Sequence, residues 1–274
     1  LMKIRKKCIL FRENNQRRSQ MISLLLPTLA NSKEDLTRLF NSLQSQTVND
    51  FELIISSQSN HEIVNELLKN YNFQYKHIEI NKRGLSQGEI LTFTDDDCWY
   101  KEDAIEYIHK VFEDPHRQIV CFQHKDPIKD MFPKKYPEQE EKNISKRRIL
   151  QQASIDIFVH TKRVPDYKLG FDETFGLGAK YNSGEENIFL MDLRNKGYTI
   201  DYIPRVVSYH PIKEKIKILD DKTVVGKGPV FKRLFGSFLG FILYLGFSAK
   251  NFQKIDKKSS ILMGIVEQIK FHRN

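Results

Sequence analysis

The feature that most constrains the fold is an alternation of strand and helix patterns between residues 21 and 94. Four apolar runs are typical of buried strands, and the segments between the first three carry apolar side chains at helical spacing. Such alternation predicts an α/β fold, with a mostly parallel central sheet and flanking helices. The predicted strands are Met21–Leu26, Phe51–Ser56, Tyr75–Ile80 and Ile90–Thr94. The first predicted helix begins at Ser32, and the second contains Val64, Leu67, Leu68 and Tyr71.

The connection between the third and fourth of these strands is too short for neighbouring parallel strands. Such a pair needs a crossover of roughly a dozen residues, usually a helix. Residues 81–89 supply only nine, with Gly84 and Gly88 among them. Either the two strands are not parallel neighbours, or a helix is missing from this connection.

Later patterns continue the alternation up to His210. They predict a helix with Ile105, Ile108 and Phe112 on one face, then a polar surface excursion over residues 124–148. The remaining predictions are a strand at residues 155–159, a loop over Tyr167–Ser183, a helix over Glu185–Lys196 ended by Gly197, and strands at residues 198–202 and Val206–Tyr209.

Composition limits the classes of protein that fit. With 274 residues the chain can form one large domain or a domain with an appendage, and 40% apolar residues exclude global disorder. Three cysteines without Cys-x-x-Cys spacing exclude a disulfide scaffold and a cysteine zinc site, and they fit a reducing compartment.

The net charge of +9 is concentrated at the two ends of the chain. Residues 1–20 carry +6 and residues 211–274 carry +8, which leaves −5 for the middle. We therefore expect three parts: a basic leader at 1–20 outside the fold, with translation starting at Met21; an α/β domain at 21–211; and a helical region at 212–274. Basic ends on an acidic core favour an anionic surface as the partner, and we expect no nucleic acid. The alternative function is that of a basic nucleic-acid-binding protein.

The C-terminal region contains the apolar run Phe235–Phe247, bracketed by lysine and arginine residues. It is too short to span a bilayer but suits a helix in the membrane interface. Ile261, Leu262, Ile265, Val266 and Ile269 form a second apolar face. We expect attachment to an anionic membrane surface; the alternative is a core helix of a C-terminal subdomain.

Three acidic residues, Asp95, Asp96 and Asp97, follow the fourth predicted strand. The carboxyl ends of strands are where ligands bind in open α/β sheets, and adjacent carboxylates suit Mg²⁺ or Mn²⁺ with substrate phosphates. Alternation puts Asp95 and Asp97 on one side and Asp96 on the other. The alternative is an acidic turn that caps the next helix.

Two further positions are candidates for chemistry. Glu185 and Glu186 open a predicted helix, where acidic residues are also favoured by the helix dipole, and either could act as a general base. His210 ends a strand; a lone histidine there is more often structural, but it could add an imidazole ligand to a carboxylate-bound metal.

Taken together, these motifs resemble the family 2 glycosyltransferases of the GT-A fold, particularly their bacterial capsular and surface-polysaccharide branch. The resemblance covers about Met21–Pro211 and rests on the order of its motifs. These are Pro27-Thr28, RGLS, GEILTFTDDDCWY, FGLGAKYNSGEENIFLMDLRNKGYTIDYIP and SYHP.

The resemblance implies transfer of a sugar, with inversion, from a nucleotide diphosphate to a hydroxyl of a lipid-linked saccharide. The expected setting is the cytoplasmic face of the cell membrane, with Mn²⁺ or Mg²⁺ as cofactor. It implies Glu186 as catalytic base beside Glu185, and Asp97, Asp95 and His210 as metal ligands. The implied substrate-binding residues are Pro27, Thr28, Ser57, Gln58, Arg83, Asp95, Asp96 and Trp99.

Two departures from the family pattern keep alternatives open. Ser56-Ser57-Gln58-Ser59 stands where many relatives have Asp-Asp-Gly-Ser, so Ser57 or Gln58 must replace the aspartate that contacts the base. The short connection at residues 81–89 lacks a helix that relatives carry there. The chain could therefore be a catalytically impaired relative that still binds nucleotide sugar or polysaccharide machinery; nucleotidyl transfer on a similar sheet is a third possibility.

Overall fold

The computed structural model describes residues 21–79, 88–176, 178–212 and 218–272. By their contacts these residues form two compact units. The sheet unit contains the described residues up to Gly170 together with Leu193–Ile212, and the helical unit contains those of Phe171–Asp192 and of Lys213–Asn274. The predicted leader at residues 1–20 lies outside the described residues.

The sheet unit is built on one eight-stranded sheet with the order β3-β2-β1-β4-β7-β6-β8-β5. Its first half is parallel, whereas β7 and β5 run antiparallel to their neighbours. The α/β class with a mostly parallel sheet is therefore confirmed. The strands are β1 (Ile22–Thr28), β2 (Phe51–Ser57), β3 (Gln74–Glu79), β4 (Ile90–Phe93), β5 (Trp99–Tyr100), β6 (Ile119–Lys125), β7 (Ile157–His160) and β8 (Ile200–Tyr209).

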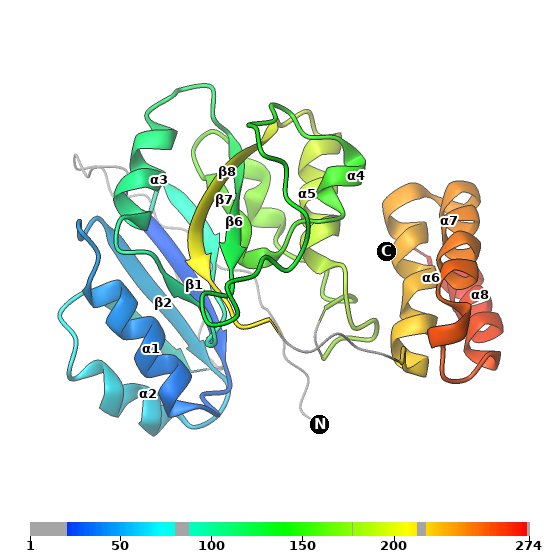
Figure 1. The fold of residues 1–274 in the computed structure, drawn as a ribbon, viewed down its shortest axis with the longest axis horizontal. Helices are drawn as coiled ribbons and strands as arrows, with labels where there is room; N and C mark the ends of the chain where they lie inside the picture. Colours follow the sequence, from blue (N-terminus) through cyan, green and yellow to red (C-terminus); the bar gives the residue numbers. More distant parts are fainter. Residues whose placement is uncertain (1–20, 80–87, 177, 213–217, 273–274) are drawn as a thin grey trace. The chain divides into compact units, whose positions relative to one another are not determined.

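Helices α1 (Lys33–Gln44), α2 (His61–Leu68) and α3 (Ala104–Phe112) share one hydrophobic core with the sheet. Figure 1 shows α1 and α2 beside the parallel strands β1 and β2. Alternate residues of β1, such as Leu24, are fully buried in this core together with Leu39 and Ile108 from the helices. Helix α1 begins where the sequence predicts, because the Ser32 hydroxyl accepts a hydrogen bond from the backbone N–H of Asp35.

The strand order answers part of the question about the short connection. β3 and β4 are not neighbours, because β2 and β1 lie between them. The connection itself lies largely outside the described residues. Its end is fixed tightly: the backbone N–H of Gly88 donates to the Ser23 hydroxyl at 2.8 Å and to the Glu52 carboxylate at 3.2 Å.

Strand β8 brings the chain back to the sheet beside β6. The register jumps from Cys121 opposite Tyr202 to Gln123 opposite Val206, so β8 bulges around Pro204, which has no N–H to donate to the ladder. The two strands predicted at 198–202 and 206–209 are thus one strand. The short elements of this unit are α4 (Lys146–Ile149) and the 3₁₀ turns η1 (Ser154–Asp156) and η2 (Pro165–Leu169).

The helical unit contains α6 (Asp221–Phe235), α7 (Ser237–Lys250) and α8 (Ser259–Lys270), with the 3₁₀ turn η3 (Phe252–Lys254) between the last two. Helix α6 packs against both α7 and α8 (Figure 1). Helix α5 (Glu185–Asn195) begins in this unit. The Arg233 guanidinium of α6 joins it to α5 through Asp192 at 2.9 and 2.6 Å and to Asp172 at 3.1 Å.

Candidate functional site

The strongest cluster of functional side chains consists of Asp95, Asp97 and His210. Each residue is half-buried and offers one ligand atom, and these atoms lie within 4.8 Å of one another. His210 Nε2 lies 3.1 Å from Asp97 Oδ1. The aspartates follow β4 and His210 follows β8, so the cluster depends on the order of strands rather than on nearness in sequence.

The chemistry of this donor set fits a divalent cation. Two carboxylates are ligands that Mg²⁺ and Mn²⁺ prefer, and an imidazole as third ligand favours Mn²⁺ over Mg²⁺. The backbone N–H of His210 donates to the carbonyl of Lys125 at 3.0 Å, which holds the residue beside β6. The residues that could hold a metal are therefore Asp95, Asp97 and His210.

Asp96 turns to a different partner. Its carboxylate accepts a hydrogen bond of 2.8 Å from the hydroxyl of Thr28, at the carboxyl end of β1. The same Thr28 hydroxyl accepts from the backbone N–H of Ala30 at 2.8 Å. Asp96 therefore has a different partner from Asp95 and Asp97, and its carboxylate is bound to the Pro27-Thr28 segment.

Trp99 is held by contacts with Tyr209 and Arg38. Its ring centroid lies 5.8 Å from that of Tyr209, its partner across the β5–β8 pairing. The guanidinium carbon of Arg38 lies 4.3 Å from the centroid of the Trp99 ring, a cation–π contact from α1. One face of Trp99 is therefore covered by Arg38.

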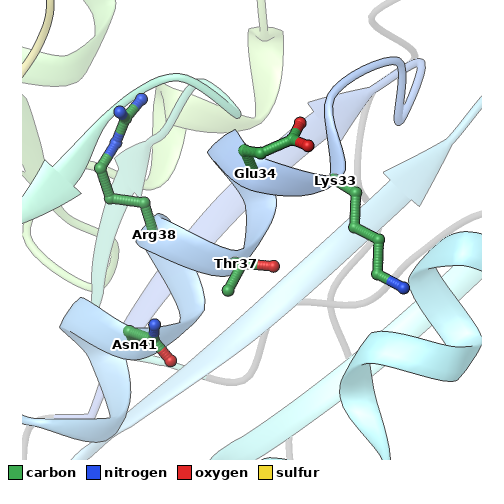
Figure 2. A pocket seen from close by; sticks show the side chains of 5 residues that line it. All are labelled: Lys33, Glu34, Thr37, Arg38 and Asn41. Atoms are coloured by element: carbon green, nitrogen blue, oxygen red, sulfur yellow. The ribbon is translucent and has the colours of Figure 1, made fainter.

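An open pocket of about 390 Å³ lies along the same helix α1. Figure 2 shows its lining side chains, Lys33, Glu34, Thr37, Arg38 and Asn41. None of them is a residue that the sequence predicts for the site. The pocket is thus a feature of the α1 surface, and Arg38, which lines it, also contacts Trp99.

Ser57 is buried between two histidines that the sequence analysis did not consider. Its hydroxyl lies 2.6 Å from His61 Nδ1 and 2.6 Å from His77 Nε2. Asn65 Oδ1, an acceptor, lies 2.7 Å from His77 Nδ1, so that nitrogen carries the hydrogen. Burial, followed by the charge of His61, lowers the pKa of His77, which keeps this ring neutral near pH 7.

The neutral state of His77 sets the direction of the hydrogen bonds made by the Ser57 hydroxyl. Neutral His77 accepts at Nε2 from the Ser57 O–H, and the Ser57 oxygen then accepts from the Nδ1–H of His61. Gln58, the residue after Ser57, is buried, and within the described part of the chain its Oε1 has no hydrogen-bond partner.

A buried polar cluster around Asp156 contacts His210 through the ring of His124. The His124 ring lies 5.9 Å from the His210 ring, and His124 Nδ1 is 2.8 Å from the fully buried Asp156 carboxylate. Lys134 and Tyr136 approach the other Asp156 oxygen at 3.3 Å each. Burial, reinforced by the Asp156 charge, raises the pKa of Tyr136, so the hydroxyl stays protonated and donates.

Glu185 and Glu186 belong to the helical unit, in the first turn of α5. Lys227 of α6 lies within electrostatic reach of both: burial lowers its pKa, and the charges of Glu186 and Glu185 oppose that shift. Its ammonium donates to the Ser183 hydroxyl at 3.0 Å. Lys227 therefore places a positive charge near both carboxylates.

The sheet unit thus brings together Thr28, Asp95, Asp96, Asp97, Trp99 and His210, with Pro27 and Ser57 at the ends of the neighbouring strands β1 and β2. Arg83 lies outside the described residues. Six further residues described above carry no sequence pattern that singles them out: Arg38, His61, His77, His124, Asp156 and Lys227.

Comparison with known proteins gives one family. Residues 23–169 match the family model described as Glycosyl transferase family 2. No curated protein matches the sequence.

Solved structures of glycosyltransferases are similar in fold. S. aureus TarS 1–349 in complex with UDP-GlcNAc is 16% identical with a TM-score of 0.66, over 91% of this chain and 81% of that one. The mannosyltransferase PcManGT from Pyrobaculum calidifontis, in complex with GDP-Man and Mn²⁺, is 12% identical with a TM-score of 0.58, over 98% of this chain and 80% of that one.

Proposed function

Because the chain belongs to glycosyl transferase family 2 and is a glycosyltransferase that uses a nucleotide-activated sugar, we propose that it performs metal-dependent, inverting transfer to a hydroxyl of a lipid-linked saccharide. The observation that carries this proposal is the cluster of Asp95, Asp97 and His210 at the carboxyl ends of strands, where ligands bind in α/β sheets. Mn²⁺ is the ion that the donor set favours.

The chain's own residues have distinct roles in this proposal. Asp97, Asp95 and His210 would hold the ion, which when bound neutralises the negative charge of the leaving diphosphate. Thr28 orients Asp96 through their 2.8 Å hydrogen bond, next to the donor. Ser57 orients His61 and, with the buried amide of Gln58, takes over recognition of the base.

Glu186 is the proposed catalytic base, with Glu185 beside it. The carboxylate accepts the proton of the acceptor hydroxyl while that oxygen bonds to the anomeric carbon and the bond from that carbon to the diphosphate oxygen breaks. A single displacement of this kind inverts the anomeric configuration. Lys227 supports the role, since it places a positive charge near this carboxylate.

The proposed acceptor and location are a lipid-linked saccharide at the inner face of a bacterial cell membrane, in capsular or surface-polysaccharide synthesis. Similarity to TarS of S. aureus supports a bacterial setting. Exposed apolar side chains in the helical unit support a membrane partner.

Binding and turnover with matched variants test the proposal. UDP-GlcNAc and GDP-Man, each with and without Mn²⁺, are titrated by calorimetry, and transfer is followed by release of nucleoside diphosphate. Asp97→Ala is expected to abolish Mn²⁺-dependent donor binding, whereas Glu186→Gln keeps binding and lowers turnover by roughly 10²–10⁴-fold.

Other outcomes would redirect the proposal. Equal loss of donor binding in both variants contradicts the separate roles. Binding without turnover in the wild type favours an impaired relative, and release of a sugar nucleotide as product identifies nucleotidyl transfer. Retention of the donor's anomeric configuration, seen by NMR of the product, excludes inversion.

A further inference from the structure

Helices α7 and α8 each carry an exposed apolar stripe. On α7 the stripe consists of Phe238, Ile242 and Leu245, and on α8 of Leu262, Val266 and Ile269, the same helical spacing on both. Phe238 is 80% exposed and Leu262 69% exposed. Side chains of this size rarely gather in water unless something covers them.

The buried faces of the same helices are polar or small. Helix α7 buries Gly240, Tyr244 and Ser248, and α8 buries Ser260, Gly264 and Gln268. Helices of water-soluble proteins bury their apolar stripe and expose their polar one. These two have the opposite arrangement, which suits helices whose outer faces contact an apolar medium.

Small residues allow the helices of this unit to approach closely. The Tyr244 hydroxyl donates to the carbonyl of Ile261 at 3.1 Å, and a side chain on Gly264 would collide with that hydroxyl. A side chain on Gly228 of α6 would collide with the backbone carbonyl of Gly264. Packing through small residues with a polar contact between helices is typical of helices in lipid.

The positions of the charged residues favour an anionic bilayer as this apolar medium. No charged residue lies between Arg233 and Lys250, whereas lysines stand at the ends of the helices, among them Lys232, Lys254 and Lys270. A second copy on this surface would bring like charges together, which disfavours a symmetric dimer. Anionic headgroups around an apolar layer complement this pattern.

We propose that α7 and α8 insert their exposed stripes into one leaflet of an anionic bilayer. Helix α7, with 14 residues, is about 21 Å long, which is less than the roughly 30 Å of a bilayer core. Among the described residues no helix has the length and apolar character needed to cross a membrane. This inference rests on the proposed function for its setting, a membrane that carries the acceptor.

Vesicle flotation of the full chain tests the inference. Wild-type protein is expected to float with vesicles of phosphatidylcholine and phosphatidylglycerol, and less with phosphatidylcholine alone. The double variants Phe238→Asn/Ile242→Asn and Leu262→Asn/Ile269→Asn are expected to bind at least tenfold more weakly. Ile128→Asn, at a 77% exposed apolar residue of the sheet unit, is the matched control and keeps wild-type binding.

Insertion is separated from surface adsorption by fluorescence. Phe238→Trp is expected to be quenched by brominated acyl chains, and Ile128→Trp, with the native Trp99 as the same background, is not. The inference would be overturned by unchanged flotation of the Asn variants or by absence of quenching at residue 238. It would also be overturned by a dimer that is stable in lipid-free buffer and dissociates in these variants. Donor binding by the Asn variants is also measured. Retained donor binding with lost membrane binding distinguishes a result on insertion from a failure of the proposed function.

Discussion

His210 Nε2 lies 3.1 Å from Asp97 Oδ1, although β4 and β8 are far apart in sequence. The contact places an imidazole among carboxylates. Because three ligand atoms here lie within 4.8 Å, removal of one should weaken cation binding strongly.

We expect His210→Ala to weaken Mn²⁺ binding at least tenfold, as measured by electron paramagnetic resonance titration. His116→Ala, at an exposed histidine of the sheet unit, is the control. Equal Mn²⁺ affinity in wild type and His210→Ala would show that the imidazole is not a ligand.

Gly88 ends the short connection in a space that excludes a side chain. A Cβ there would lie 2.5 Å from the carbonyl oxygen of Met21 and 2.7 Å from the amide nitrogen of Ser23. Gly88→Ala is expected to lower the free energy of unfolding by about 2–3 kcal/mol, measured by denaturant titration. Gly246→Ala, where nothing lies within 4 Å of the new Cβ, should cost nothing.

Arg233 is the ionic centre of the helical unit. Its side chain is 6% exposed and contacts both Asp192 and Asp172. Arg233→Ala removes the cation from two carboxylates and should cost about 3–5 kcal/mol of stability in thermal and chemical denaturation. The control Lys257→Ala, whose partner Asp221 lies 3.2 Å away near the surface, should cost less than about 1 kcal/mol.

His160, buried at the end of β7, makes stability depend on pH. Burial, aided by the charge of Arg163, lowers its pKa to about 4. Unfolded histidine titrates near 6.5, so between pH 6.5 and 4 the unfolded state binds more protons and stability falls as pH falls. Each pH unit in this window costs up to about 1.4 kcal/mol.

We expect His160→Gln to flatten the pH dependence of the free energy of unfolding between pH 6.5 and 4. The measurement is a series of denaturation curves, with His116→Gln as the exposed control. An unchanged slope in His160→Gln would mean that other groups cause the acid sensitivity.

Local patterns were enough to predict most of the first half of the sheet. β1 to β4 lie within two residues of their predicted bounds, because each is a short apolar run with clear ends. β6 and β5 were not predicted. In β6 the apolar Ile119–Phe122 runs directly into polar residues, and two-residue β5 exists because Trp99 and Tyr100 pair with β8.

Local patterns predicted the candidate site where residues are adjacent in sequence, and the order of the motifs added His210 to Asp95 and Asp97. The sequence analysis separates Asp96 from Asp95 and Asp97, and in the structure Asp96 bonds Thr28 while the other two lie beside His210. The contacts of Ser57 with His77, and of His124 with Asp156, join residues from different strands or turns. The partners are 20 and 32 positions apart in sequence, and no local pattern encodes which side chains meet across such a separation.

The placement of β8 between β6 and β5 has a consequence for synthesis. A nascent chain emerges from its N-terminus at about 5–20 residues per second, so Asp95 and Asp97 leave the ribosome many seconds before His210. Until β8 docks, the growing polypeptide holds two of the three ligand groups. A divalent ion that uses all three groups could therefore be bound in full only late, after β8 has joined the sheet unit.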